Sequence, residues 1–247
     1  ADLKLNSEQT LIHAEKLISL GAEGVVLGGS TGQSQSLSYE CKMNLIDQAS
    51  KSLQNQKIII GPGTNSLLDT AKLINYAKKK NLKKFLIMPG AYGWSSIKNK
   101  EEAVYSYFAE LLNRVNECEI IIYNFSKLNQ LDFTVEMVER LVKDYPNIFL
   151  GLKDSGNDNL FEKIKIKNFK VYVGSEKKLL SSLKCGCSGL ISATVNTFFL
   201  LDLARKVFED FKKGKDQEHN ELLVKLRSIF DEFNLIEGLH TLYAQKD

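Results

Sequence analysis

The sequence predicts an α/β fold, a (β/α)8 TIM barrel with C-terminal helices. Short apolar runs bounded by Gly, Pro or Asn recur seven times, with starts about 20–35 residues apart, and helical patterns fill the gaps between them. This alternation implies parallel strands joined by right-handed crossovers. A chain of 247 residues also suits a single barrel, and no linker, internal repeat or composition break divides it.

The predicted strands are too short for helices and are apolar without alternation, which is typical of strands buried on both faces. They cover residues 24–28, 57–61, 85–89, 120–124, 149–153, 171–174 and 189–192. Apolar residues three and four positions apart predict the helices. The first begins at Asn6 or Ser7, either a favourable N-cap, and ends at Gly21. The other helical stripes lie at 45–53, 104–115, 135–142, 179–183, 197–213 and 217–233.

A closed barrel has eight strands and requires one before the helix at 7–20. Only residues 1–5 are available there, and they are too polar for a buried strand. We therefore expect the first strand to precede this chain. The barrel then covers 1–196, and 197–247 hold the last barrel helix and the start of a C-terminal helical region. The alternative is an open, doubly wound sheet of seven strands.

Composition and charge exclude several classes of partner. With 33 Lys and Arg against 30 Asp and Glu, the net charge of +3 favours neither nucleic acid nor an anionic membrane as the main partner. No stretch approaches the roughly 18 apolar residues of a membrane span, and no signal peptide is visible, which indicates a cytoplasmic protein.

The cysteines form no CxxC pair and are expected to be reduced structural thiols: Cys41, Cys118, Cys185 and Cys187.

The three histidines, His13, His219 and His240, are expected to lie away from the strand ends. This argues against a histidine metal site and against a Ser-His-Asp site. The chemistry must then use Lys, Tyr, Ser, Thr or carboxylates. In a barrel such residues act from the carboxyl ends of the strands.

Lys153 is the most informative of these residues, because it ends an apolar strand and is followed by Asp154. Burial lowers the pKa of a lysine, and the neutral amine is a nucleophile toward a carbonyl. The alternative is a snorkelling lysine paired with Asp154. The residues alone leave both interpretations open.

A glycine-rich turn at residues 28–32 follows the first predicted strand. Its backbone N–H groups suit a carboxylate, and the hydroxyls of Ser30 and Thr31 add donors or pass protons. A plain tight turn is the alternative. Tyr123, at the end of its strand, is either an acid/base or a barrel-filling aromatic. Tyr92 by itself is an ordinary loop aromatic.

Together these segments resemble the dihydrodipicolinate synthase / N-acetylneuraminate lyase family of class I, Schiff-base aldolases, from about residue 6 to residue 233. The resemblance rests on Gly29-Ser30-Thr31-Gly32 with Leu37-Ser38, Gly61-Pro62-Gly63-Thr64-Asn65, Tyr123-Asn124-Phe125, Gly151-Leu152-Lys153-Asp154-Ser155, Val173-Gly174-Ser175 and Gly189-Leu190-Ile191-Ser192. It also implies the barrel, extra C-terminal helices and a homotetramer built as a dimer of dimers.

The resemblance implies a role for each site residue. Lys153 forms an imine with pyruvate or another 2-oxo acid, Tyr123 shuttles protons and Ser30 relays them. Tyr92 of a neighbouring subunit completes the relay. Substrate binding falls to the remaining motif residues, with Thr31 holding the carboxylate: Thr31, Gly29, Gly32, Gly174 and Ile191. No metal and no organic cofactor is required.

Departures from the family pattern concern the second substrate. Gln33 replaces the usual Glu after the turn, and Ser126 stands where the family has Pro. Leu128 falls where dihydrodipicolinate synthases carry the Arg that binds the carboxylate of the aldehyde. Lys127 is a poor substitute, since lysine does not bind a carboxylate bidentately. The segment around Glu176 does not reproduce the acidic pair of sialic acid lyases.

We therefore expect a lyase that forms a Schiff base with pyruvate and makes or breaks a carbon–carbon bond to an aldehyde. Dihydrodipicolinate synthase-like activity ranks first, as the commonest assignment in the family. A 2-keto-3-deoxy sugar acid aldolase or an N-acetylneuraminate lyase comes next. A non-catalytic barrel that binds 2-oxo acids is the alternative from another class. An open-sheet nucleotide-binding protein is a third hypothesis, but it leaves Lys153 unexplained.

Overall fold

The computed structural model describes residues 5–90, 93–156 and 160–244. Within these ranges the strands form one parallel sheet in which the spatial order follows the chain order. The strands are β1 (Val25–Leu27), β2 (Ile58–Ile60), β3 (Lys84–Ile87), β4 (Glu119–Asn124), β5 (Phe149–Asp154), β6 (Lys170–Val173) and β7 (Gly189–Leu190). Each overlaps a predicted range, so the seven strand predictions are confirmed.

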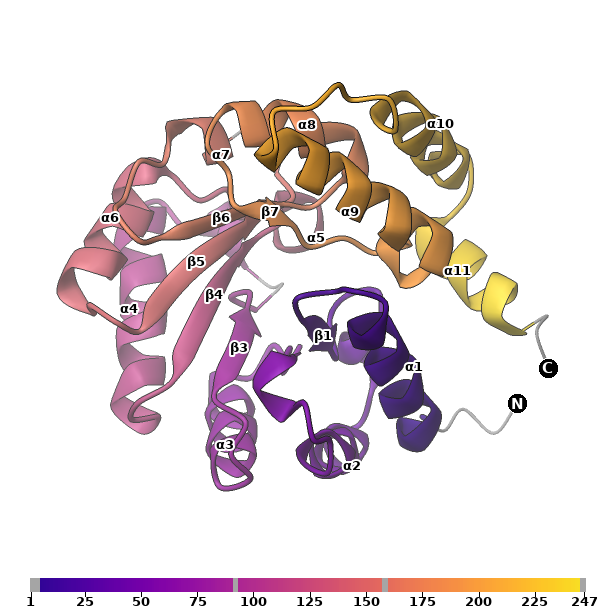
Figure 1. The fold of residues 1–247 in the computed structure, drawn as a ribbon. Coiled ribbons are helices and arrows are strands. Elements are labelled where there is room, and N and C mark those ends of the chain that lie inside the picture. The colour runs from indigo at the N-terminus through magenta and orange to yellow at the C-terminus, as the bar shows by residue number, and fades with distance from the viewer. Residues whose placement is uncertain (1–4, 91–92, 157–159, 245–247) are drawn as a thin grey trace.

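The sheet curls, and helices cover its outer side (Figure 1). A doubly wound sheet reverses its strand order at an internal switch point, whereas this order runs from β1 to β7 without reversal. The described chain is thus a curled α/β half-barrel, and the doubly wound alternative is wrong. The eighth strand of a closed barrel stays a prediction.

The longer helices are α1 (Ser7–Ser19), α2 (Tyr39–Ser50), α3 (Leu67–Lys78), α4 (Lys100–Arg114), α6 (Val135–Asp144), α9 (Phe198–Lys212), α10 (Asn220–Asp231) and α11 (Leu235–Ala244). Three shorter ones are α5 (Ser126–Asn129), α7 (Leu160–Lys163) and α8 (Leu179–Lys184). Asn6 caps α1, because its side chain accepts from the Gln9 backbone N–H at 3.0 Å. The first of the two predicted caps is therefore correct.

Helices α3 and α11 are absent from the predicted set. The signal for α3 is nevertheless present in the sequence. Ser66 caps the helix by accepting from the Asp69 backbone N–H at 3.1 Å, and Ala71, Ile74 and Ala77 repeat at three-residue spacing on its buried face. For α11 the local signal is Asn234, whose side chain accepts from the backbone N–H groups of the first turn.

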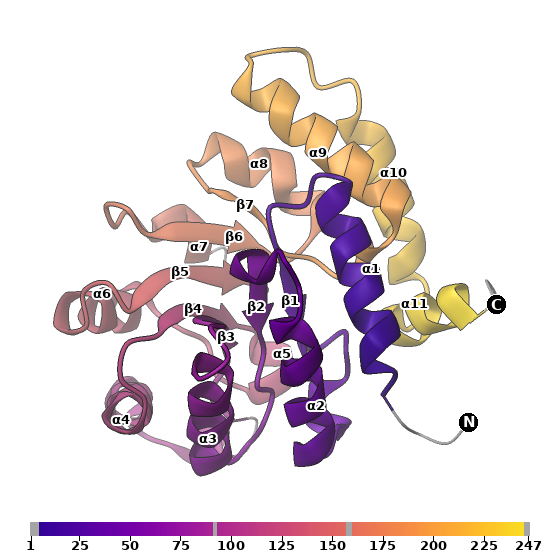
Figure 2. The same cartoon turned by 60° about the horizontal axis from the view of Figure 1, so that its bottom comes forward.

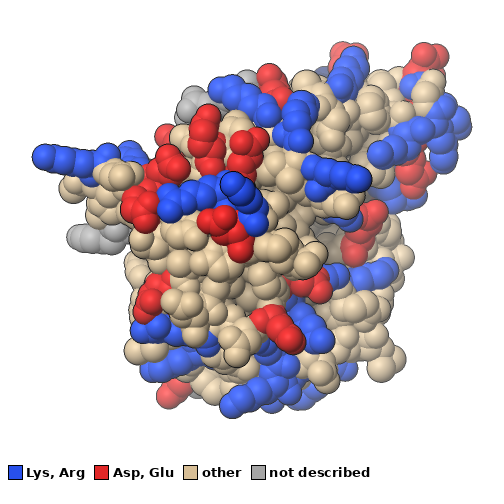
Figure 3. Space-filling model, turned by 90° about the vertical axis from the view of Figure 1, so that its left-hand side faces the viewer, with Lys and Arg blue, Asp and Glu red and all other residues tan. Residues whose placement is uncertain are grey.

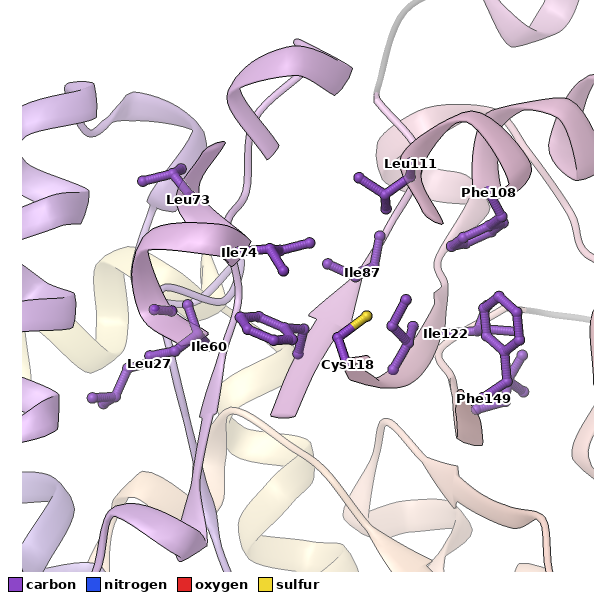
Figure 4. Close-up of a cluster of buried hydrophobic side chains, with 14 of the residues drawn as sticks. Leu27, Ile60, Leu73, Ile74, Ile87, Phe108, Leu111, Cys118, Ile122 and Phe149 are labelled. Carbon is purple, nitrogen blue, oxygen red and sulfur yellow. The ribbon is translucent and has the colours of Figure 1, made fainter. Parts of the chain in front are cut away.

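The main core lies between the sheet and its surrounding helices. Phe108 of α4 packs edge-to-face on Phe149 of β5, with ring centroids 5.3 Å apart. Figure 4 shows these rings among apolar side chains from several strands and from α3 and α4. A smaller cluster occupies the inner face and comprises Leu86, Ile121 and Tyr123, with Val26, Ile59, Met88, Phe125, Tyr172 and Ile191 against it. The strands are therefore covered on both faces, as their apolar sequences predict.

Charge on the protein surface is mixed in sign. Figure 3 shows Lys and Arg side chains beside Asp and Glu side chains over one face. Local pairs such as Arg140 with Glu102, at 2.8 Å, are exposed and stabilise only modestly. None of the helices in the described ranges has both the length and the apolar character needed to cross a bilayer. The first and last helices, α1 and α11, lie side by side in both ribbon views (Figures 1 and 2).

The four cysteines are free thiols. Cys118 and Cys187 are buried, and burial raises the pKa of each thiol to about 11. Both are therefore protonated at neutral pH and pack as small apolar side chains. This agrees with the structural role expected for them.

The register between β4 and β5 slips by one residue between Ile120 and Ile121. Beyond the slip, Tyr123 lies opposite Lys153. Without it, Tyr123 would lie opposite Leu152, because a slip of one residue exchanges the two faces of a strand. The slip therefore decides which side chain of β5 faces Tyr123.

Gly151 is required beside this slip, because a Cβ atom at that position would lie 2.2 Å from the Lys170 carbonyl oxygen of β6. We expect Gly151→Ala to lower the free energy of unfolding by about 1–3 kcal/mol through overpacking against backbone. Gly238→Ala is the matched control, since an added Cβ there meets no atom within 4 Å. Denaturant unfolding of both variants measures this, and equal stabilities would contradict the requirement for glycine.

Candidate active site

Three side chains that are far apart in the sequence meet at the carboxyl ends of the strands. Tyr123 of β4 and Lys153 of β5 are register partners, and Lys153 Nζ lies 4.2 Å from the centroid of the Tyr123 ring. The Tyr123 hydroxyl is 3.1 Å from Ser30 Oγ, and either oxygen can donate the hydrogen bond. The Tyr123 side chain is only 5% exposed. The structure thus brings together three of the four predicted catalytic residues.

Asn124 and Asp154, which follow Tyr123 and Lys153 on the same strands, form hydrogen bonds on the opposite face of the sheet. Asn124 and Asp154 are also register partners, and Asn124 Nδ2 donates to Asp154 Oδ1 at 2.9 Å. Asp154 accepts from the Gly156 backbone N–H at 3.0 Å, and Asn124 accepts from the Phe133 backbone N–H at 3.3 Å. Both side chains are buried. Since successive side chains of a strand point to opposite faces, this favours an inward Lys153 over its pairing with Asp154.

The glycine-rich turn lies against the loop that follows β2. Gly28 has a φ of +74°, and a Cβ atom there would lie 2.6 Å from the Gly61 carbonyl oxygen. A Cβ on Gly61 would lie equally close to the carbonyl oxygen of Gly28. The two backbones therefore touch, which only glycine allows. This contact places Gly29 and Ser30 at a cavity beside Tyr123.

The cavity has a volume of about 210 Å³. Among the described residues that line it there is no Lys, Arg, Asp, Glu or His. The polar side chains that line it, apart from Ser30 and Tyr123, are Gln33, Ser34, Gln35, Ser36, Thr64 and Thr70, and the larger apolar ones are Leu86, Ile87, Met88, Leu128 and Ile236. The cavity therefore offers hydroxyl and amide groups to a ligand but no counter-charge. In the described parts of the chain, no three His, Cys, Asp or Glu side chains gather as a metal site would require.

The other predicted site residues occupy neighbouring positions. The Gly174 backbone N–H donates to the Asp154 carbonyl at 2.9 Å, and Ile191 packs with the cluster around Tyr123. Thr31 and Gly32 belong to the turn but do not line the cavity, and neither do Lys153, Gly174 and Ile191. Tyr92 lies outside the described residues. The substrate-binding roles of these residues stay predictions.

Two further candidates come from α11, and no local sequence pattern reveals them. Ile236 lines the cavity, and His240 Nε2 lies 3.3 Å from the carbonyl oxygen of Thr31. Of the three histidines, His240 thus contacts the turn that follows β1. A contact between residues 209 positions apart depends on how the C-terminal helices pack, and that packing has no signature in the sequence around either residue.

A buried charged cluster lies beside the site. Glu176, which follows β6, is fully buried, and its carboxylate accepts from Ser192 Oγ at 2.9 Å and from Thr194 Oγ1. The same carboxylate pairs with Arg227 of α10, with an N–O separation of 3.0 Å. Glu176 is thus engaged by protein partners and ties α10 to the ends of β6 and β7.

Family and structure comparisons agree with this arrangement. Residues 2–242 match the model of the dihydrodipicolinate synthetase family. The chain belongs to this family. Membership confirms the family resemblance predicted from the sequence. It also makes this dihydrodipicolinate synthetase family member an enzyme of the lyase type, as expected.

The proteins that are similar to this chain include a named synthase and a named aldolase. A 4-hydroxy-tetrahydrodipicolinate synthase from Hydrogenobaculum sp. is 29% identical over 231 residues, which cover 89% of this chain and 76% of the relative. A prophage protein of the dihydrodipicolinic acid synthase family from E. coli, solved in complex with pyruvate, superposes with a TM-score of 0.84 at 22% identity, covering 96% of this chain and 82% of that one. A 2-keto 3-deoxygluconate aldolase from Picrophilus torridus gives a TM-score of 0.80 at 22% identity, covering 93% and 82%. The two solved structures share the fold with this chain.

We expect Glu176→Ala to destabilise the fold by about 3–5 kcal/mol, because it removes the buried carboxylate partner of Arg227 and leaves that guanidinium only the more exposed Asp231. Glu110→Ala is the control, since Glu110 pairs with Arg114 on the surface, away from this cluster. Removing that exposed pair is expected to cost less than about 1 kcal/mol. Thermal and denaturant unfolding measure both changes. A Glu176→Ala protein as stable as Glu110→Ala would show that the buried pair is dispensable.

Proposed function

We propose that this protein is a pyruvate-dependent aldolase or synthase that forms a Schiff base at Lys153. The observation that carries the proposal is the lysine beside Tyr123, whose hydroxyl is bonded to Ser30. A sensor of 2-oxo acids needs a carboxylate-binding turn, but it needs no proton relay directed at a lysine. The pyruvate complex of the E. coli relative supports a 2-oxo acid as the first substrate.

The mechanism follows from the three side chains. The neutral amine of Lys153 attacks the keto carbon of pyruvate, and loss of water leaves an iminium that withdraws electrons from the methyl group. The relay of Tyr123 and Ser30 takes a methyl proton, which gives an enamine. The enamine carbon attacks the aldehyde carbon, the relay returns the proton to the new alkoxide, and water hydrolyses the imine. Run in reverse, the same steps cleave a larger 2-oxo acid, and neither direction calls for a metal or an organic cofactor.

The remaining assignments belong to the same proposal. Thr31 and the backbone of Gly29 and Gly32 hold the pyruvate carboxylate, with Gly174 and Ile191 flanking it. Tyr92 of a neighbouring subunit completes the relay in a homotetramer. The barrel covers 1–196, and the helical region covers 197–247. The substrates are small molecules in the cytoplasm, with no nucleic acid or membrane partner.

The uncharged cavity favours a neutral, hydroxylated aldehyde as the second substrate. Leu128 lines the cavity at the position expected to bind a carboxylate, while the neighbouring Lys127 is exposed and does not line it. Hydroxyl and amide side chains suit the hydroxyl groups of a sugar-derived aldehyde, which is the chemistry of 2-keto-3-deoxy sugar acid aldolases. Dihydrodipicolinate synthase activity, with aspartate semialdehyde as acceptor, is the second candidate, and the names of the curated relatives favour it.

We expect pyruvate followed by borohydride to leave a reduced, stable adduct on Lys153, because reduction traps the imine. Peptide mass spectrometry locates the adduct. Lys163, on the short helix α7, is the control residue and should stay unmodified. A folded protein that gains no adduct at Lys153 would reject the aldolase mechanism, and an adduct on many lysines would show that the reaction is unspecific.

We expect aspartate semialdehyde to react with a kcat/KM about 10- to 100-fold below that of glyceraldehyde, because its carboxylate lacks a charged partner in the cavity. Leu128→Arg should raise kcat/KM for aspartate semialdehyde and lower it for glyceraldehyde. Steady-state kinetics with saturating pyruvate measure both. If wild-type protein prefers aspartate semialdehyde, another cation binds that carboxylate and the second candidate is the correct function.

A further inference from the structure

Helix α11 contributes part of the cavity wall. Ile236 is in the first turn of this helix and lines the cavity together with Leu128 of α5, Ser30 and Tyr123. Ile236 is the one residue after α5 among the described residues that line the cavity. The last helix of the described chain is therefore part of the cavity wall, although Ile236 is 113 residues beyond Tyr123 in the sequence.

The position of Ile236 is fixed by the start of the helix. Asn234 Oδ1 accepts from the backbone N–H groups of Ile236 and Glu237, at 3.2 and 3.4 Å, in the manner of an N-cap. The Gly238 backbone N–H donates to the Asn234 carbonyl at 2.8 Å. Three hydrogen bonds to one residue thus determine the direction in which the first turn of α11 presents its side chains.

The rest of α11 contacts segments that follow the two edge strands of the curled sheet, β1 and β7. His240 Nε2 lies 3.3 Å from the Thr31 carbonyl, and the Tyr243 hydroxyl donates to the Asn196 carbonyl. The Tyr243 ring packs edge-on against His13 of α1, with centroids 4.9 Å apart, and Leu239 is 3% exposed. These contacts reach the turn after β1, the segment after β7 and the first helix. The wall that Ile236 forms is therefore held against the site from three sides.

We propose that Ile236 is a specificity-determining residue that limits the length of the acceptor aldehyde. This rests on the proposed function, in which pyruvate occupies the side of the cavity at Ser30 and Tyr123. An acceptor that reacts at the enamine must fit in the remaining space of the cavity, which Leu128 and Ile236 also line. A branched, rigid side chain in this wall then limits the room for the last carbons of the acceptor. In an apolar pocket, one methylene of misfit changes kcat/KM by about 10- to 200-fold.

The test compares acceptors of increasing length with Ile236→Ala, Ile236→Phe and the wild-type protein. Glycolaldehyde, glyceraldehyde and erythrose are used with saturating pyruvate. Ile236→Phe is expected to lower kcat/KM for erythrose relative to glycolaldehyde by about 10-fold or more, mainly through KM, and Ile236→Ala to raise that ratio. Thr241→Ala, an exposed position on the same helix, is the matched control and should leave the ratio unchanged.

Borohydride trapping of pyruvate at Lys153 separates the two proposals, because imine formation needs no acceptor. If the wild-type protein forms no adduct, the proposed function is wrong and the role of Ile236 falls with it. If the adduct forms but the ratio of erythrose to glycolaldehyde is the same in all Ile236 variants, Ile236 does not set acceptor length. The same conclusion follows if Ile236→Phe abolishes the adduct while remaining folded, since Ile236 would then border the pyruvate side. Circular dichroism and melting temperatures verify that each variant is folded.

Discussion

The register between β4 and β5 is the constraint on which the site depends. Beyond the slip near Gly151, Tyr123 faces Lys153 across one ladder position, and Asn124 faces Asp154 at the next. One pair points inward to the site, and the other points outward to the loops. Without the slip, Leu152 would lie opposite Tyr123, and Lys153 would turn to the other face of the sheet. The crowding of Gly151 against the adjacent strand therefore bears on the chemistry as well as on packing.

The remaining parts of the site are positioned by the same sheet. Because all strands are parallel and follow one another in order, their carboxyl ends lie along a single rim. The turn after β1 thus reaches Tyr123 on β4, although Ser30 and Tyr123 are 93 residues apart. The contact between Gly28 and Gly61 fixes that turn against the loop after β2. The 3.1 Å hydrogen bond between Ser30 and Tyr123 therefore depends on the positions of β1, β2 and β4 in the sheet and on the backbone contact between Gly28 and Gly61.

The sequence predicts this part of the molecule well because its signals are local. Apolar runs and their turn residues identify every strand, and the residues that end the runs are the ones that meet at the rim. Contacts between segments that are distant in the sequence cannot be predicted in this way, because neither segment alone identifies its partner. Nothing near Glu176 in the sequence shows that it is buried against Arg227 of α10, and nothing near the exposed His240 shows that it contacts Thr31. These partners are set by the packing of the C-terminal helices, which periodicity does not specify.

The two halves of the site are thus built from different kinds of structure. Tyr123 and Lys153 belong to strands within the hydrogen-bonded sheet, where a substitution disturbs several ladder positions at once. Leu128 and Ile236 belong to α5 and α11, which lie outside the sheet. A substitution at either position therefore disturbs no hydrogen bonds between strands. Loops and peripheral helices change more readily than a scaffold of strands. In the proposed function the strand residues activate the 2-oxo acid and the peripheral helices contact the acceptor, so the acceptor side is the part of the site that can vary with the least effect on the sheet. Proteins similar to this chain accordingly carry the names of a synthase and of an aldolase.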